Sequence, residues 1–325
     1  MTRCGSGWPA GAFCAAECQP AWFGAFLQRV IIGRMIRFCR ESARSLWRFP
    51  ACPSQSGAPT PPSSTLRSGG MSELVKVEVV DGIQIMTVNR PEAKNAIDLA
   101  TAQALAAALD HLDSREDVRI GILTGAGGTF SSGMDLKAFA LSRQRPLIDG
   151  RGFAGLAEAP PEKPLIAAVE GYALAGGCEM ALAADLIVAA RDAKFGLPEV
   201  KRGLVPGSGG MLRLPRRLPY HIAMEVILTG DMLGAERAYS LGLVNRLAEP
   251  GQALAGALEL ARVIVANGPL AVQTAKSIVA QSGDWEQDGM FDRQRPLIAH
   301  IFTSADAKEG ATAFAEKRKP VWQGK

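Results

Sequence analysis

The sequence predicts an α/β body, residues 71–265, followed by a helical C-terminal region, residues 266–325. Three observations indicate this arrangement. Within the body a buried strand, a glycine turn and a helix follow one another and then recur, which favours stacked βα units with a mostly parallel sheet. Beyond Gly207 strand patterns nearly vanish and helical spacing takes over. Residues 1–70 differ sharply in composition from the rest of the chain, so we expect them to lie outside the fold.

The body opens with a β-hairpin signal. Residues 74–89 alternate apolar and polar side chains around Asp81-Gly82, a dipeptide that favours tight hairpin turns. Pro91 ends the second strand because proline cannot donate to a strand ladder. Residues 98–112 then have apolar side chains at helical spacing, with Asp98 as the N-cap.

The repeat comes next, and the C-terminal helices lie beyond it. Strands are expected at residues 119–124, 164–169 and 185–190, helices at 133–139 and 179–184, and a glycine loop at 171–177. Helices are expected at residues 208–217, 220–229, 234–241, 252–267, 270–281, 284–302 and 305–318.

Residues 1–70 form an extension with its own charge and cysteine content. They hold eight arginines, no lysine and two acids, for a net +6, and five of the six cysteines. One interpretation is an organellar transit peptide, since such segments are rich in arginine and poor in acids. The other, which we favour, is that translation begins at Met71, because the tryptophan, cysteine and proline residues are scattered without period.

Charge and cysteine content of the body exclude several classes of protein. The remaining residues hold 28 basic and 30 acidic side chains, a net −2, so no nucleic-acid-binding face is expected. A single cysteine, Cys178, is typical of a reducing compartment, and we expect a cytoplasmic protein without disulfides. No convincing metal-ligand spacing is present, and charged residues interrupt the best candidate for a membrane span.

Two glycine turns carry the candidate chemistry. One surrounds Gly133-Met134 and the other surrounds Gly176, and each presents free backbone N–H groups at a helix start. Two such donors converging on one oxygen would form an oxyanion hole. Nucleotide-binding patterns fail on spacing, and the three histidines lie in no nucleophile motif. Tight packing alone would also explain each turn.

Two glutamates could supply proton transfer beside such a turn. Glu179 lies one helical turn after the Gly176-Gly177 pair, and Glu199 comes about twenty residues later, each within a predominantly apolar segment. Two carboxyl groups near one site would raise the pKa of one of them into the range useful for acid–base catalysis. A salt bridge is the alternative interpretation for each glutamate taken singly. Cys178 is interpreted as a small buried hydrophobic residue.

Several segments of the chain together form one recognisable pattern: NRPEAKNAID (89–98), ILTGAGGTFSSGMDLKAF (122–139), PLIAAVEGYALAGGCEMALAADLIVAA (164–190), AKFGLPEVKRGLVPGSGG (193–210) and AFAEKRKP (313–320). In order and spacing they resemble the enoyl-CoA hydratase/isomerase (crotonase) family, across residues 72–325. The resemblance implies a crotonase-like spiral of ββα units and a helical C-terminal trimerisation region. Trimers of this family often pair into hexamers, so a homotrimer or a dimer of trimers is expected.

The same resemblance implies a role for each matching residue. The N–H groups of Met134 and Gly176 would form the oxyanion hole for an acyl-CoA thioester, and Glu179 and Glu199 would be the catalytic glutamates. The positions expected to contact the CoA substrate or the catalytic water are Ala93, Lys94, Ser132, Asp135, Leu136, Gly207, Phe314 and Lys317. Phe314 and Lys317 commonly reach CoA from a neighbouring subunit. No metal and no cofactor beyond the CoA of the substrate is implied.

Both glutamates are present, so reversible hydration of a 2-enoyl-CoA, a reaction of lipid metabolism, is the activity we expect. Enoyl-CoA isomerisation is one alternative, because family isomerases can work with one carboxylate. GFAGL (152–156) and neighbouring stretches resemble the carnitinyl-CoA dehydratase branch, and a non-catalytic acyl-CoA-binding or RNA-binding role is the third possibility. Ser132 stands where the family commonly has alanine, and Ala175 stands where it commonly has glycine. Neither change removes a backbone N–H donor. Residues 140–163 are expected to face the acyl chain, which the sequence does not identify.

Overall fold

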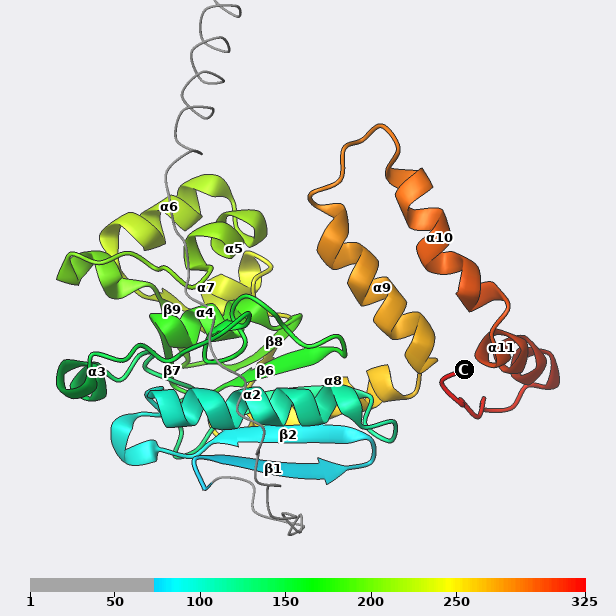
Figure 1. The fold of residues 1–325 in the computed structure, drawn as a ribbon, viewed down its shortest axis with the longest axis horizontal. Helices are drawn as coiled ribbons and strands as arrows, with labels where there is room; N and C mark the ends of the chain where they lie inside the picture. The colour runs from blue at the N-terminus through cyan, green and yellow to red at the C-terminus, as the bar shows by residue number, and fades with distance from the viewer. Residues whose placement is uncertain (1–72) are drawn as a thin grey trace, which may run out of the picture. The chain divides into compact units, whose positions relative to one another are not determined.

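The computed structural model describes residues 73–325, which all belong to one compact unit, Arg67–Lys325 (Figure 1). The predictions for residues 1–70 therefore lie outside the described residues. The proposed division of the body after residue 265 stays a prediction.

The main sheet has six strands in the order β1-β2-β3-β6-β8-β11. Its strands are β1 (Val75–Val80), β2 (Ile83–Val88), β3 (Ile120–Gly125), β6 (Leu165–Val169), β8 (Leu186–Ala190) and β11 (Arg246–Ala248). β1 and β2 form the predicted antiparallel hairpin, and every later pairing in this sheet is parallel. The hairpin and the mostly parallel sheet are thus confirmed.

Short strands that the sequence did not predict build a second sheet. It pairs β10 (Leu233–Gly234), β9 (Lys194–Gly196) and β7 (Tyr172–Leu174) in that order, and β4 (Leu147–Ile148) pairs with β5 (Gly152–Phe153) separately. The expectation of a loop at 171–177 was therefore wrong, because β7 and the first turn of α4 (Gly176–Ala183) occupy it. These strands have two or three residues each, too few to show a period in the sequence.

Three helices of the body differ in how closely they agree with prediction. α2 (Leu99–Ser114) begins as expected, because the Asp98 side chain accepts a hydrogen bond from Thr101 N. α3 (Leu136–Ser142) begins three residues late, since Asp135 caps it by accepting from Lys137 N and Ala138 N. α4 begins three residues early, at Gly176.

Apolar side chains cover both faces of the main sheet. One cluster packs α2 and α4 against the sheet and includes Met86, Leu109 and Leu123, all fully buried. On the other face α8 (Ala253–Val265) packs its buried Ala257 and Ala261 against isoleucines of β2, β3 and β6. The sheet is therefore a buried scaffold whose loops carry the candidate site.

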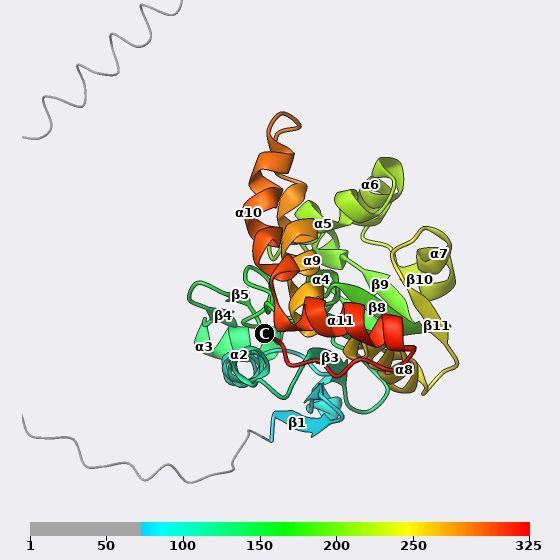
Figure 2. The ribbon, with the colours of Figure 1, turned by 90° about the vertical axis from the view of Figure 1, so that its right-hand side faces the viewer.

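The remaining helices agree closely with prediction, with one exception. They are α5 (Gly210–Arg217), α6 (Tyr220–Thr229), α7 (Ala235–Ser240), α9 (Pro269–Ser282), α10 (Met290–Phe302) and α11 (Ala305–Glu316), with short 3-10 turns η1 (Pro91–Ala93) and η2 (Pro198–Arg202). The helix expected from residue 284 begins only at Met290, after Gly289 in a left-handed conformation. α9 and α10 run side by side in both ribbon views (Figure 2). They expose large apolar side chains, among them Val279, Phe291 and Phe302.

The C-terminal tail packs back onto the body. The buried Asp306 carboxylate accepts hydrogen bonds from the backbone N–H groups of Gln323 and Gly324, and Trp322 Nε1 donates to Ala266 O. A cavity of about 240 Å³ lies between this tail and the end of α2, and none of the predicted site residues lines it. The tail therefore fixes α11 relative to α8 without touching the candidate site.

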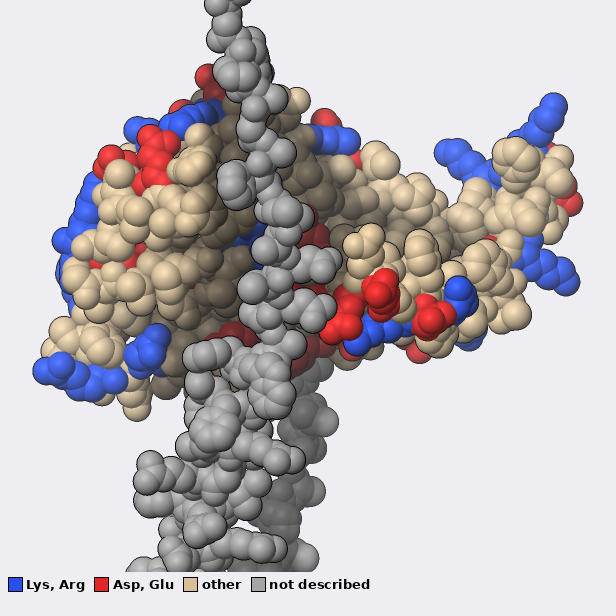
Figure 3. Space-filling model, turned by 90° about the horizontal axis from the view of Figure 1, so that it is seen from above, with Lys and Arg blue, Asp and Glu red and all other residues tan. Residues whose placement is uncertain are grey.

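On the visible part of the face in Figure 3, basic and acidic side chains are interspersed. This distribution agrees with the nearly balanced charge of the body. In residues 73–325, no single helix has both the length and the apolarity of a membrane span, and only α8 with α9, bent by 108°, passes that test as a pair.

Candidate active site

The two glycine turns predicted from sequence lie against each other. An isolated bridge pairs Ser131 with Ala173, and Leu174 N donates to Ser131 O at 3.0 Å. A Cβ atom added to Gly133 would lie 2.8 Å from Gly176 N, so the two loops are in direct contact. Within the described chain no backbone hydrogen bond uses the N–H of Met134 or of Gly176. Neither N–H group is thus taken by the backbone, as the donors of an oxyanion hole require.

Close packing at this point explains the glycines. A Cβ on Gly177 would approach the backbone oxygen of Ser131 to 2.3 Å, and one on Gly176 would approach the Phe153 ring to 2.5 Å. Gly133 has φ +89°, a conformation that residues with a Cβ rarely adopt. The glycines therefore serve close loop packing, which does not exclude a role of the free N–H groups, so the two interpretations of the turns are compatible.

Ala175 stands in a strained conformation directly before α4. Its φ of 50° and ψ of −126° lie in a region that favours glycine. The neighbouring structure holds it there through two backbone hydrogen bonds, from Ala175 N to Gly196 O and from Glu179 N to Ala175 O. The alanine at this position therefore keeps the turn geometry at an energetic cost.

Glu179 belongs to α4, and its side chain is buried against the N-terminus of α5. Its side chain is only 2% exposed, and Oε1 accepts hydrogen bonds from Ser208 N at 2.6 Å and Gly210 N at 2.9 Å. Burial raises the pKa of Glu179, while these two N–H donors and the charge of Arg213 act in the opposite direction. The Ser208 side chain also forms a hydrogen bond to this carboxylate and, like the two N–H donors, lowers its pKa.

Glu199 lies in a different environment, in the first turn of η2. Its Oε2 is buried and has no hydrogen-bond partner in the described part of the chain. Burial, reinforced by the charge of Glu179, raises the pKa of Glu199 to about 7. The two glutamates therefore share one electrostatic site, in which Glu179 Oε1 has two fixed donors and Glu199 Oε2 has none.

Cys178 and His111 are the other titratable side chains considered for acid–base chemistry, and the structure favours neither over the two glutamates. Cys178 is buried, and desolvation raises the pKa of its thiol to about 12, so the interpretation as a small hydrophobic residue is supported. His111 Nδ1 lies 2.7 Å from Oε1 of the buried Gln84, between α2 and β2. In residues 73–325 no cluster of three metal-ligating side chains occurs.

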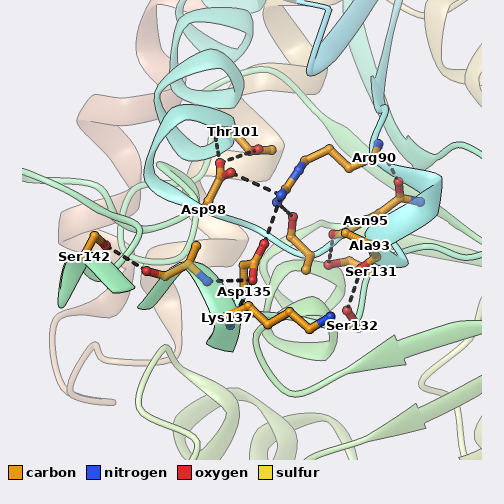
Figure 4. A network of polar contacts seen from close by, with 12 residues as sticks. Arg90, Ala93, Asn95, Asp98, Thr101, Ser131, Ser132, Asp135, Lys137 and Ser142 are labelled. Atoms are coloured by element: carbon orange, nitrogen blue, oxygen red, sulfur yellow. Dashed lines mark hydrogen bonds and ion pairs between the residues drawn. The ribbon is translucent and has the colours of Figure 1, made fainter. Parts of the chain in front are cut away.

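The segments expected to line CoA meet in one polar network (Figure 4). Ser132 N donates to Lys94 O at 3.0 Å, and Ser132 Oγ lies 3.5 Å from Ala93 O. Arg90 stands at the centre, where its Nη2 lies 2.9 Å from Asp135 Oδ2 and 3.3 Å from Asp98 Oδ2. The network thus brings Ala93, Lys94, Ser132 and Asp135 together.

Within this network Asp135 is occupied by protein contacts. Its carboxylate pairs with Arg90 and caps α3, and the N–H groups of Lys137 and Ala138 with Arg90 lower its pKa in spite of burial. The side chain therefore holds the loop that carries Met134, and its contact with CoA stays a prediction. Leu136, the next residue, is 49% exposed.

The remaining predicted residues fall in two places. Gly207 directly precedes Ser208 in the loop that binds Glu179, and a Cβ there would meet only Val205 O, at 3.8 Å. Phe314 and Lys317 lie on α11 and at its C-cap, and Phe314 is 88% exposed. No hydrogen bond or ion pair in the described chain joins these two to the glutamates, and their contact with CoA stays a prediction.

Residues 78–325 match the enoyl-CoA hydratase/isomerase family. The chain belongs to this family. It is 43% identical over 263 residues to the carnitinyl-CoA dehydratase of Salmonella enteritidis PT4, covering 78% of this chain and 100% of that protein. The resemblance inferred from the sequence motifs is confirmed.

Solved structures of the enoyl-CoA hydratase/isomerase family are similar to this one. Enoyl-CoA hydratase from Mycobacterium tuberculosis H37Rv is 60% identical with a TM-score of 0.77, covering 78% of this chain and 100% of that chain. Carnitinyl-CoA hydratase from Mycobacterium avium is 40% identical with a TM-score of 0.62, with the same coverage. The predicted crotonase-like α/β fold with helices at its C-terminal end is confirmed.

Three residues that form hydrogen bonds in the candidate active site were not predicted from the sequence. Ser208 and Gly210 bind Glu179 through backbone N–H groups, and Arg90 organises the loop of Met134. The glycine-rich run at 207–210 was a usable signal, since it precedes a helix whose free N–H groups favour a carboxylate. The partner of Arg90 lies 45 residues away, and local pattern does not reveal such a pair.

Proposed function

We propose that this chain is an enoyl-CoA hydratase that adds water reversibly to the double bond of a 2-enoyl-CoA thioester. The observation that carries the proposal is the pair of glutamates in unlike environments beside two free N–H donors. A hydratase needs one group to accept a proton from water and another to donate one to carbon, so unlike ionisation suits the reaction. Membership of the enoyl-CoA hydratase/isomerase family supports the same activity.

In the mechanism we propose, the thioester oxygen accepts hydrogen bonds from the N–H groups of Met134 and Gly176. The ionised Glu179 takes a proton from water as the water oxygen bonds to Cβ. The electrons of the double bond move toward the thioester oxygen, where the two N–H donors stabilise the enolate. Protonated Glu199 then donates its proton to Cα, and exchange with solvent resets both carboxyl groups.

A second candidate substrate is a carnitinyl-type acyl chain. The 43% identity to a carnitinyl-CoA dehydratase favours it, whereas the 60% identity to an enoyl-CoA hydratase favours a general enoyl-CoA. Both reactions use the same water chemistry, so the catalytic assignment is common to them. A panel of thioesters that includes crotonobetainyl-CoA separates them by their kcat/KM ratios.

Oxygen-18 water tests hydration against isomerisation. A hydratase incorporates one labelled oxygen at C3 of the 3-hydroxyacyl product, and mass spectrometry of that product detects it. A shifted double bond without label would instead show an isomerase and would overturn the proposal.

We also infer a cytoplasmic homotrimer or dimer of trimers that acts in lipid metabolism. The exposed apolar side chains of α9–α11 support assembly, because such surfaces favour burial against a partner. Sedimentation equilibrium tests this inference: three or six chain masses are expected, and a stable monomer would contradict it.

A further inference from the structure

Arg213 lies against the Ser208–Gly210 loop, which binds Glu179. It belongs to the first turn of α5, and its backbone N–H donates to Gly209 O at 2.8 Å. Its guanidinium Nη2 donates to Ala157 O at 2.7 Å, across to the segment that comes after β5. The side chain therefore joins two loops that are 56 residues apart in sequence.

The guanidinium also packs directly on Gly209. A Cβ atom on that residue would lie 2.3 Å from Arg213 Nη1, and Gly209 has φ +102°. Gly209 stands between Ser208 and Gly210, whose N–H groups bind Glu179 Oε1. Displacing the guanidinium would therefore loosen the loop that holds this carboxylate.

Among the described residues, Arg213 is the cation whose charge lowers the pKa of Glu179. Glu199 faces it from η2 and Cys178 neighbours it on α4, and neither supplies positive charge. Arg202 acts on Glu199, and Arg217 interacts with Arg213 and Asp185. Only Arg213 thus combines contact with the loop and a favourable charge toward Glu179.

We propose that Arg213 is a positioning residue of the hydratase site: it clamps the Ser208–Gly210 loop against Glu179 and keeps that carboxylate ionised and aimed. The inference rests on the proposed function, because ionised Glu179 is the base that activates water. Arg213 itself touches no reacting atom.

Arg213→Gln and Arg213→Lys separate charge from hydrogen bonding. Arg213→Gln removes the charge and, because its amide is shorter than the guanidinium side chain, also the hydrogen bond to Ala157 O, so the pKa of Glu179 rises and the acidic limb of the kcat/KM profile moves to higher pH by about one unit. Arg213→Lys keeps the charge and leaves that limb in place. Displacement of the loop lowers kcat of Arg213→Gln by about 100-fold, with KM changed by less than about threefold.

Arg217→Gln is the matched control. Arg217 lies one turn further along α5, is also largely removed from solvent, and donates to Ala184 O at 3.3 Å without acting on Glu179. Its substitution leaves the acidic limb unmoved. Equal losses of kcat in Arg213→Gln and Arg217→Gln with an unmoved limb would show a merely structural role and would overturn the proposal.

Infrared titration of the Glu179 carboxylate, isolated by subtracting the spectrum of Glu179→Gln, gives a readout that needs no turnover. If the wild type hydrates no enoyl-CoA, the proposed function fails, but a higher Glu179 pKa in Arg213→Gln still supports the positioning role. An unchanged Glu179 titration in Arg213→Gln contradicts that role whether or not the protein is active.

Discussion

At the scale of single residues, Ala175 is the clearest strain in the site. A non-glycine residue in such a conformation costs about 1–3 kcal/mol, and replacing it by glycine also adds freedom to the unfolded chain. We expect Ala175→Gly to raise the free energy of unfolding by about 1 kcal/mol, measured by chemical denaturation.

Ala266→Gly is the control for this substitution, because Ala266 is exposed at an ordinary φ of −69°. It is expected to lose stability by up to about 1 kcal/mol. Equal losses in both variants would show that the site accommodates Ala175 without strain.

Glu199 links the chemistry of the site to stability. Its pKa is raised from 4.5 to about 7 in the folded protein, so the folded state binds its proton more tightly than the unfolded chain does. The stability associated with this proton is fully present below pH 4.5 and is lost as the pH rises through 7. The difference corresponds to ~3 kcal/mol, which partial solvent exposure reduces to about 1 kcal/mol.

Glu199→Gln removes this ionisation. We therefore expect the variant to gain about 1 kcal/mol over the wild type at pH 8 and nothing at pH 4.5, measured by denaturant unfolding at both values. A gain that does not depend on pH would contradict the raised pKa.

At the scale of elements, the contact between α4 and the Ser131–Met134 loop would position the donors of the proposed oxyanion hole. Gly177→Ala places a methyl group against the backbone oxygen of Ser131, so one element must move. We expect a loss of about 1–3 kcal/mol in stability together with a lower kcat, measured by unfolding and by the hydration assay.

Gly234→Ala is the matched control, since a Cβ there meets no atom within 4 Å and its φ is −70°. Its kcat should equal that of the wild type. If Gly177→Ala also kept full kcat, the close approach of the two loops would not be what positions the donors.

Elements with strong local signals were predictable from sequence. The β1–β2 hairpin depends on Asp81-Gly82, and the start of α2 depends on the Asp98 cap, so neighbouring residues decide both. β7, β9 and β10 were not predictable, because each has two or three residues and forms only by pairing with distant segments. The start of α10 at Met290 depends on the left-handed Gly289.

At the scale of the whole molecule, the family motifs predict the two glutamates and both donors, since each lies in a short continuous segment. The clamp by Arg213 was missed, because its contacts join α5 to a residue 56 positions away. Phe314 lies exposed on α11, and the resemblance to the family predicts that it contacts CoA from a neighbouring subunit. One copy of the chain thus brings together the residues of the proposed catalytic centre, while the proposed CoA contacts of α11 stay a prediction.

The hydration rates of Glu179→Gln and Glu199→Gln test the central claim most directly. Each glutamine keeps the size of the side chain and removes its acid–base function. With a 2-enoyl-CoA substrate we predict a loss of kcat of about 10²–10⁴-fold for each variant, and no loss for the exposed control Glu225→Gln. Full hydration activity in either Glu179→Gln or Glu199→Gln would contradict a site built on two carboxyl groups.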